Sequence, residues 1–489
     1  MAVTLSNDTL KALPGGVAVP EYDRAGLTPG ILHIGVGNFH RAHMAWYLDR
    51  LFAQGEGHDW AIVGAGIKPF DAARRDALAA QDWLTTVVEL DPAALTARVT
   101  GAMVDFCEID GAALVARLTD PAIRIVSLTV TEGGYFVDAE TGGFDKSNIE
   151  IAADAADPDS PKTVFGLLVK GLKARHDAGL PPFTVMSCDN LPENGHVAKA
   201  AVVGMAELID PALAGWISAN VAFPCGMVDC ITPATGPREI ALVKERFGVD
   251  DKAPVVCEPF RQWVLEDTFP QGRPALEKVG VEFVPDVAPY ETMKLRILNA
   301  GHAAIAYPSA LLGHHFVHEG MQDPDVAAWL KALMRAEVIP VLPEIGGVDF
   351  DAYLEKSAER FANPEIGDTI ARLCLDGSNR QPKFVLPTAR EALEAGSAIQ
   401  GLALEVALWC RYCIETTTGR ITLEDERAEA LQAAALRAQT DPSAFLGLTD
   451  IFGRLGEVPR FVEAFAAGLA DLDEKGVRPV LQEYVAAQG

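Results

Sequence analysis

The segment I-L-H-I-G-V-G-N-F-H-R-A-H limits the fold more than any other part of the chain. Residues 31–34 are an apolar run of strand length, and Gly35 and Gly37 predict a tight turn after it. A helix is expected over residues 38–52, and a second apolar strand over residues 60–67 follows at the spacing of a βαβ unit. A strand, a glycine turn and a helix in this order are the context that a nucleotide-binding loop requires.

The turn departs from the usual G-x-G-x-x-G pattern, because His40 stands where a third glycine is normal. A simple tight turn between a strand and a helix is therefore the competing interpretation. If the turn binds a dinucleotide, the residues expected to contact the cofactor are Gly35, Gly37, Asn38 and Phe39.

Strand and helix patterns alternate from the glycine turn to about residue 286. The further predicted strands are residues 83–90, 97–106, 122–131, 182–190 and a short strand that carries Asp229. Such alternation predicts a mostly parallel sheet covered by helices. Ligands of these sheets bind at the carboxyl ends of the strands. Glu132, Asn190 and Asp229 fall at such ends, and Glu132 is a further candidate for cofactor binding.

Beyond this point strand signals nearly vanish. The expected helices are residues 291–312, 325–338, 365–374, 387–396, 400–416, 422–439 and 457–470. A chain of 489 residues is too long for one hydrophobic core, so the change of pattern sets the expected domain boundary. The predicted fold is α/β. Residues 1–286 are expected to form a domain with a mostly parallel sheet, and residues 287–489 a mostly α-helical domain.

A long, alanine-rich helical stretch opens the second domain and carries three polar residues, Lys294, Asn299 and His302. At about 100° per residue all three lie on one broad side of the helix. Burial disfavours the ammonium form of a lysine, which lowers its pKa toward the range of a general base. The alternative is that Lys294 extends to solvent from a helix end. Together with a nucleotide turn, this set indicates hydride transfer, which needs a base and donors to the reacting oxygen.

The charge balance excludes two classes of partner. There are 41 Lys and Arg residues against 68 Asp and Glu, a formal net charge of −27. So acidic a surface disfavours nucleic acid and anionic membranes. No signal peptide or membrane span is visible, and the 8 cysteines are scattered, which suits reduced thiols. A cytoplasmic protein is expected, either a monomer or a weak homo-oligomer.

Four stretches carry a resemblance to a known family. They are G-V-G-N-F-H-R-A-H at residues 35–43, C-D-N-L-P-E-N-G at 188–195, K-L-R-I-L-N-A-G-H at 294–302 and L-D-G-S-N-R-Q-P-K-F at 375–384. In these stretches the chain resembles the polyol-specific long-chain dehydrogenases, the family of the mannitol 2-dehydrogenases. The resemblance implies that residues 1–286 are a Rossmann-like dinucleotide-binding domain and that residues 287–489 are a mostly helical substrate-binding and catalytic domain.

The resemblance also implies roles for the polar residues of the helical stretch. Lys294 would be the general acid and base of a reaction that uses no metal. Asn190 and Asn299 would form the oxyanion hole, and His302 would position the substrate.

Further residues match family positions that contact the polyol. Asp229 and Arg372 match directly, whereas Arg380 stands where the family usually has lysine. The implied reaction converts a polyol to a ketose, with D-mannitol to D-fructose as the first expectation. An arginine fork suits a carboxylate, so a hexuronate, as in the fructuronate and tagaturonate reductases, is an alternative. D-arabinitol and D-sorbitol are others.

The choice of cofactor depends on the end of the second strand. Asp71 could bind the ribose hydroxyls of NAD, whereas Lys68 with Arg74 or Arg75 could meet the extra phosphate of NADP. The resemblance favours NAD.

One rival hypothesis belongs to another class of enzyme. His314, His315, His318 and Glu319 have a spacing on a helix that could hold a metal, as in a metal hydrolase. The stretch lacks the H-E-x-x-H arrangement, and the resemblance implies a metal-free mechanism, so no metal is expected.

Overall fold

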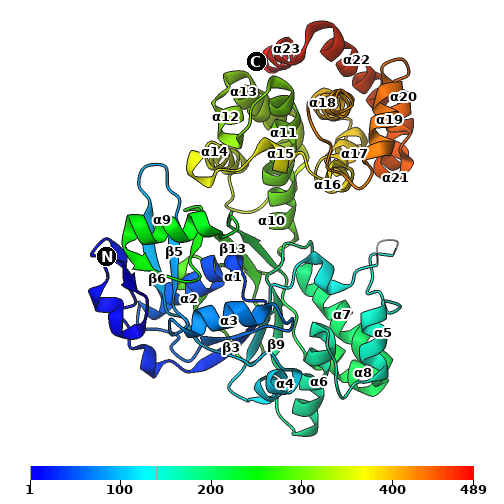
Figure 1. Cartoon of the computed structure of the whole chain (residues 1–489). Coiled ribbons are helices and arrows are strands. Elements are labelled where there is room, and N and C mark those ends of the chain that lie inside the picture. Colours follow the sequence, from blue (N-terminus) through cyan, green and yellow to red (C-terminus); the bar gives the residue numbers. More distant parts are fainter. Residues whose placement is uncertain (1, 139–140) are drawn as a thin grey trace. The chain divides into compact units, whose positions relative to one another are not determined.

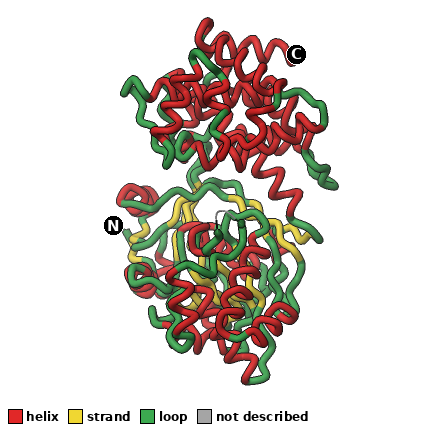
Figure 2. Tube along the Cα trace, turned by 90° about the vertical axis from the view of Figure 1, so that its right-hand side faces the viewer, coloured by secondary structure: helices red, strands yellow, loops and turns green. Residues whose placement is uncertain are grey.

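The computed structural model describes residues 2–138 and 141–489 of the chain, which divides into two compact units. Unit 1 is Met1–Ala288 and unit 2 is Pro289–Gly489. Figure 1 gives the element labels, and Figure 2 shows that the strands belong to unit 1 whereas unit 2 is built from helices. In the described part of the chain no helix is both long and apolar enough to cross a bilayer.

A parallel sheet of five strands forms the centre of unit 1, in the order β7-β4-β3-β8-β9. Its strands are β3 (Pro29–Ile34), β4 (Ala61–Ala65), β7 (Met103–Phe106), β8 (Ile125–Leu128) and β9 (Thr184–Ser187). The chain runs outward from β3 in one direction and then returns to its other side at β8. The carboxyl ends of β3 and β8 therefore flank the point at which such sheets bind ligands.

Alternating side chains of β3 enter two cores, as the pattern of a buried strand predicts. Leu32 and Ile34 lie in one core, whereas Ile31 lies in the other. The first core is covered by α4 (Gly111–Thr119), α6 (Val164–Asp177), α7 (Asn194–Ile209) and α8 (Pro211–Asn220), and the second by α2 (Met44–Phe52). The remaining helices of eight or more residues in unit 1 are α3 (Asp71–Ala79), α5 (Ile149–Ala156) and α9 (Pro237–Phe247).

Two predicted elements of unit 1 are broken. The strand expected over residues 97–106 divides at Gly101, whose N–H donates to Asp49 and whose carbonyl accepts from Arg24. As a result β6 (Thr96–Thr100) leaves the central sheet. The helix expected over residues 38–52 divides at His43, which separates α1 (Asn38–Ala42) from α2.

Three smaller sheets complete unit 1. Their strand orders are β12-β5-β6-β2, β10-β13-β14 and β1-β11. The bounds are β1 (Val3–Thr4), β2 (Val17–Ala18), β5 (Thr85–Glu89), β10 (Gly226–Asp229), β11 (Val249–Asp250), β12 (Val255–Cys257), β13 (Gln262–Glu266) and β14 (Glu282–Val284).

Unit 2 is helical. Its larger helices are α11 (Ala300–Leu312), α13 (Pro324–Leu333), α14 (Phe350–Phe361), α16 (Gly377–Phe384), α17 (Leu386–Glu394), α18 (Gln400–Thr416), α19 (Ala428–Ala438), α22 (Pro459–Lys475) and α23 (Val477–Gln488). Sequence reasoning did not predict α14, α16 and α23. A mostly parallel sheet domain followed by a helical region confirms the predicted fold class.

The helix α18 is the core of unit 2. It is buried along nearly its whole length and packs against α11, α19 and α22. Its first turn is capped by Glu337, whose carboxylate accepts from the backbone N–H groups of Gly401 (2.7 Å) and Leu402 (2.9 Å). The hydroxyl of Tyr484 donates to the same carboxylate (3.0 Å). Three donors satisfy a buried carboxylate, so this cap suits the ionised form.

Candidate functional site

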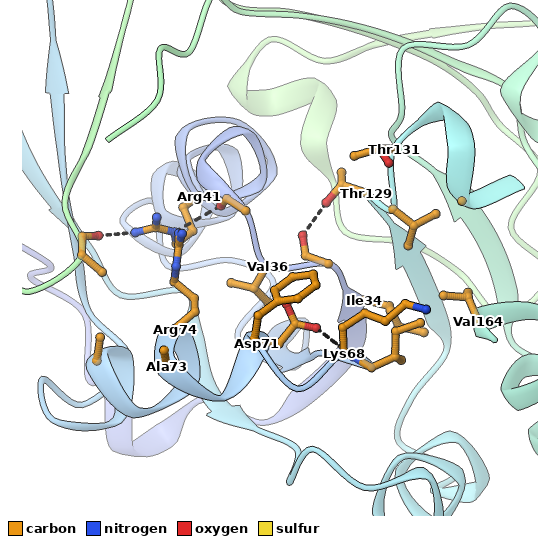
Figure 3. Close-up of a pocket in the computed structure, with 18 of the residues that line it drawn as sticks. Ile34, Val36, Arg41, Lys68, Asp71, Ala73, Arg74, Thr129, Thr131 and Val164 are labelled. Atoms are coloured by element: carbon orange, nitrogen blue, oxygen red, sulfur yellow. Dashed lines mark hydrogen bonds between the residues drawn. The ribbon is translucent and has the colours of Figure 1, made fainter. Parts of the chain in front are cut away.

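A cavity of about 780 Å³ opens at the carboxyl ends of β3, β4 and β8 in unit 1. Its lining includes Ile34 to Gly37, several residues between Ile67 and Ala77, and Thr129 to Thr131. Figure 3 shows these segments around the cavity. Its volume lies within the range of sites for small molecules and cofactors. It also lies where the strand order of the sheet reverses, so fold and cavity indicate the same ligand site.

The glycine turn requires glycine at its first position. Gly35 has φ +97°, and an added Cβ atom would lie 2.0 Å from the carbonyl oxygen of Thr129. The N–H of Gly35 donates to the carbonyl of Ala65 (3.0 Å), which fixes the turn against β4. Gly37 precedes α1 and also lines the cavity. The turn therefore brings backbone N–H groups, with no side chain in front of them, to the cavity, and a bound phosphate group needs such donors.

A pair of stacked histidines explains the absence of a third glycine. The His40 ring lies 3.4 Å from the His33 ring of β3, nearly parallel to it. His33 is anchored by Ser127 and by Thr129, and its Nε2 also contacts the carbonyl of Gly35. A third glycine normally permits close packing of helix on strand; here two flat rings fill that space. Burial lowers the pKa of His33 to about 3 and holds the pKa of His40 well below its ordinary value, so both rings are neutral.

The opposite wall of the cavity is held by a buried carboxylate. Asp189 accepts from the backbone N–H groups of Val130 and Thr131 (both 2.9 Å) and from the hydroxyl of Tyr135 (2.7 Å). Thr131 has φ +67°, a conformation that costs free energy for a β-branched residue. The two backbone hydrogen bonds maintain this conformation. Sequence reasoning missed this wall, although an acidic residue directly after a buried strand was a usable signal.

Two arginines give the cavity a positive side, where Figure 3 shows them next to each other. Arg41 is buried and donates to the carbonyls of Gly37 and Ala253 and to the side chain of Asn38. Burial, together with the charge of Arg74, lowers the pKa of Arg41 to about 9. Arg74 donates to the same Asn38 oxygen (3.1 Å). Sequence reasoning named Arg74 but not Arg41.

The segment after β4 supplies the groups that could distinguish cofactors. Oδ2 of Asp71 accepts from the backbone N–H groups of Ile67 (3.0 Å) and Lys68 (2.9 Å). The Lys68 ammonium pairs with Glu150 (3.3 Å). Phe70 also lines the cavity, yet 76% of its surface is exposed. An apolar ring so placed offers a face on which a planar base could stack.

The predicted cofactor residues thus fall into two groups. Gly35, Gly37 and Asp71 line the cavity. Asn38, Phe39 and Glu132 are not among its lining residues. Both polar ends of the Asn38 side chain are used within the protein, and the Phe39 ring packs on His43 (4.8 Å between ring centres).

Asn190 and Asp229 lie at the ends of two strands of unit 1. Asn190 is exposed in the turn after β9, and Asp229 is the buried last residue of β10. Asn194 ties these two regions together, because its side chain donates to the carbonyls of Asp189 (3.1 Å) and Gly226 (2.7 Å).

In unit 2, Lys294 and Asn299 are the first and last residues of a π-helical turn, η5 (Lys294–Asn299). Sequence reasoning treated this stretch as regular α-helix, in which residues five apart point about 140° away from each other. In a π-helix the N–H of residue i+5 bonds to the carbonyl of residue i, so the two residues lie on the same side. Lys294 is buried, with 8% of its surface exposed. The turn is anchored by Arg296, which donates to Thr388 and to Glu391.

His302 lies on α11, where its ring packs on Phe361 (4.0 Å between ring centres). Burial holds the pKa of His302 well below its ordinary value, and the positive charges of Arg372, Arg380 and Arg360 add to the effect. The ring is therefore neutral, with one nitrogen to donate and one to accept. The fold thus brings three predicted substrate residues, His302, Arg372 and Arg380, to one region of unit 2.

The residues of the rival metal hypothesis make other contacts. His314 bonds to Asp323 (3.1 Å), and Glu319 accepts from the backbone N–H groups of His315 and Phe316. His318 stacks on Phe316. Across residues 2–138 and 141–489, no three His, Cys, Asp or Glu side chains gather as a set of metal ligands.

Two family models match this chain. The mannitol dehydrogenase Rossmann domain matches residues 29–278, and the mannitol dehydrogenase C-terminal domain matches residues 286–473. The chain belongs to the mannitol dehydrogenase family. This finding confirms the family that the four sequence stretches indicated.

Individual relatives extend the match over the whole chain. A mannitol 2-dehydrogenase of Cereibacter sphaeroides is 57% identical over 475 residues, which cover 96% of this chain and 99% of the relative. A solved Pseudomonas fluorescens mannitol 2-dehydrogenase, in ternary complex with NAD and D-mannitol, has a TM-score of 0.85 and 42% identity over 99% of this chain and 100% of that one. A solved D-sorbitol dehydrogenase in substrate-free form has a TM-score of 0.90 and 38% identity, covering 98% of this chain and 100% of that one.

Proposed function

We propose that this family member is an NAD-dependent polyol dehydrogenase that interconverts D-mannitol and D-fructose. The observation that carries the proposal is the match, over 96% of the chain, to a mannitol 2-dehydrogenase at 57% identity. It is supported by the Pseudomonas fluorescens relative, whose structure holds NAD and D-mannitol. The cavity at the carboxyl ends of β3 and β8 supplies a fitting site for a dinucleotide.

The residues of this cavity fit NAD. The backbone of Gly35 and Gly37 would hold the diphosphate, and the second oxygen of Asp71, Oδ1, would accept from a ribose hydroxyl. Lys68 is paired with Glu150, which weakens its attraction for the extra phosphate of NADP, whereas Arg74 donates to the neutral side chain of Asn38 and keeps its charge. When bound, the cofactor accepts the hydride from the polyol carbinol.

The chemistry assigned to this chain is proton transfer and stabilisation of the reacting oxygen. We assign to Lys294 the role of the base that takes the hydroxyl proton, and to Asn190 and Asn299 the donors that stabilise the oxygen. The neutral ring of His302 would orient the polyol. The π-helical turn supports this assignment, because it brings Lys294 and Asn299 to one side of the helix.

The two arginines of unit 2 differ in what they offer a hexuronate. Arg372 forms a two-point ion pair with Asp368, which compensates its charge. Arg380 donates to the neutral carbonyl of Leu373 and keeps its charge, so a hexuronate remains an alternative to an uncharged polyol. D-sorbitol is the second candidate substrate, because the D-sorbitol dehydrogenase has the higher TM-score of the two solved relatives named above.

NADH formation measured with D-mannitol, D-sorbitol, D-arabinitol and hexuronates tests the substrate. Lys294→Ala should leave NAD affinity unchanged but lose most turnover, whereas the control Lys331→Ala should keep both, since Lys331 pairs with Glu355 on the surface of unit 2. Turnover by Lys294→Ala close to that of the parent enzyme would eliminate Lys294 as the base.

We further propose a cytoplasmic monomer or weak homo-oligomer. Light scattering of the purified protein over a range of concentrations tests the assembly, and a stable oligomer at the lowest concentration would contradict it.

A further inference from the structure

A buried carboxyl and a buried carboxamide face each other in the core of unit 2. Glu405 lies in the middle of α18 and Gln381 lies on α16; each has 1% of its surface exposed. Nε2 of Gln381 donates to Oε1 of Glu405 (2.7 Å). Within the described part of the chain, the other two polar atoms of this pair, Oε2 of Glu405 and Oε1 of Gln381, are buried without a hydrogen-bond partner.

A proton on Glu405 would satisfy both unpartnered atoms. A neutral carboxylic acid, like an amide, has a donor and an acceptor side by side. The protonated Oε2 of Glu405 could donate to Oε1 of Gln381, which closes a ring of two hydrogen bonds. The ionised form would instead leave two buried acceptor oxygens without a donor, which is costly.

Comparison with Glu337 shows the contrast within the same unit. That carboxylate is equally buried but accepts from three donors, two backbone N–H groups and a tyrosine hydroxyl. Glu405 has one donor, Nε2 of Gln381, and the other polar atom of that carboxamide is an acceptor, Oε1. Burial raises the pKa of Glu337 as well, but there all three donors oppose the shift. The surroundings of Glu337 therefore suit an anion better than those of Glu405 do.

The groups around Glu405 supply no compensating cation. Burial raises the pKa of Glu405 to about 8, opposed by the hydrogen bond from Gln381. From α11 it is faced by Tyr307, whose own pKa is raised by burial and then by Glu405. Arg380, which precedes Gln381 on α16, donates to the carbonyl of Leu373. On the α22 side, Asp473 pairs with Arg411 of α18.

The pair connects the core to the helix that carries Arg380. The first turn of α16 is fixed by Ser378, whose N–H and hydroxyl donate to Asp425 (2.8 and 2.6 Å). The middle of α16 is fixed to α18 through Gln381. The charge of Arg380 acts on His302, so the position of α16 affects the region assigned to the substrate.

We propose that Glu405 is held as the neutral acid and that its closed pair with Gln381 positions α16, so that ionisation of Glu405 at alkaline pH weakens polyol binding. Glu405 and Gln381 are positioning residues in this scheme, because they act through Arg380. The effect on polyol binding rests on the function proposed above, whereas the protonation of Glu405 does not.

Infrared spectroscopy tests the protonation without any need for activity. At about pH 7 the parent protein should show the band of a protonated, hydrogen-bonded carboxyl group. Glu405→Gln should remove this band, and the control Glu337→Gln should keep it. Absence of the band in the parent protein, or its survival in Glu405→Gln, would overturn the proposal. If Glu405→Gln does not fold, Gln381→Met serves instead, because loss of the partner must shift the band; an unshifted band would also overturn the proposal.

The KM for the polyol against pH tests the positioning. The parent KM for D-mannitol should rise about 2- to 10-fold from about pH 7 to about pH 9.5, the range expected when one net hydrogen bond is lost. A glutamine at 405 makes the same two hydrogen bonds without a titrating proton, so its KM should lack this rise, while Glu337→Gln should keep it. An equal rise in Glu405→Gln would refute the positioning role. Absence of turnover with every polyol would refute the proposed function instead, and the infrared result would still decide the protonation.

Discussion

Replacement of Gly35 by alanine tests how closely the cofactor turn depends on bare backbone. At φ +97° an alanine costs about 1–3 kcal/mol in backbone strain. Its Cβ would also lie 2.0 Å from the carbonyl oxygen of Thr129, so β3 and β8 must separate there. Separation weakens two hydrogen bonds, from the Thr129 N–H to Ile34 (3.0 Å) and from the Thr129 hydroxyl to Gly35 (2.6 Å). At about 0.5–1.5 kcal/mol each, these bring the total to about 2–6 kcal/mol.

A cost of this size leaves a protein of ordinary stability folded but disturbs its cofactor site. We expect the Kd for NAD of Gly35→Ala, measured by calorimetry, to rise at least about 30-fold. Gly55→Ala is the matched control, because Gly55 also has positive φ (+81°) but no atom lies within 4 Å of an added Cβ. The control should lose a little stability toward urea and no NAD affinity. An NAD affinity of Gly35→Ala within about threefold of the parent value would refute the reasoning.

Two further predictions concern the same unit. Phe70→Ala should weaken NAD binding by about 1–3 kcal/mol without a change in kcat, because stacking of the adenine on an aromatic ring contributes about that much. Phe70→Trp should bind NAD as tightly as the parent in the same titration. Equal Kd values for the parent, Phe70→Ala and Phe70→Trp would contradict the stacking. Acid stability depends on the buried histidines. Because the pKa of each is lowered in the folded protein, only the unfolded chain binds the extra proton as the pH drops below about 6.5. The free energy of unfolding therefore falls below this pH, by about 1.4 kcal/mol per pH unit for each such histidine. His40→Phe keeps a flat ring on His33 without this proton, so its unfolding free energy in urea should fall less steeply between about pH 6.5 and about pH 4.5; an unchanged slope would show that His40 does not titrate there.

The central sheet and its glycine turn could be predicted because local patterns determine them. Residues 31–34 alternate between two cores, and Gly35 is needed for a turn that only glycine permits. The break of the first helix at His43 could not be predicted. The ring of His43 packs on Trp263 and donates to the carbonyl of Gln262, far along the chain.

The helical unit was harder to predict, since its boundaries depend on distant partners. α16 contains Gly377 and Pro382, which normally disfavour a helix, and Asp425 holds its first turn. Lys294, Asn299 and His302 could be proposed from their spacing and from the family resemblance. The π-helical turn itself could not, because the stretch K-L-R-I-L-N contains ordinary helix formers.

The residues that line the cavity also divide into those that could be predicted from the sequence and those that could not. Gly35, Gly37 and Asp71 belong to the strand–turn–helix motif and could be recognised from it. Thr131 and Arg41 reach the cavity only through the fold, held by Asp189 and by the carbonyl of Ala253.

The widened turn at Lys294–Asn299 has a consequence for protein engineering. Copying the K-x-x-x-x-N spacing onto a designed straight helix would place the amine and the amide about 140° apart around the helix axis. Deleting one residue inside the turn would instead leave the two residues four apart, and residues four apart are neighbours on a regular α-helix. A transplanted helix that keeps the five-residue spacing must therefore carry its irregular backbone, with Arg296 and the groups that anchor it.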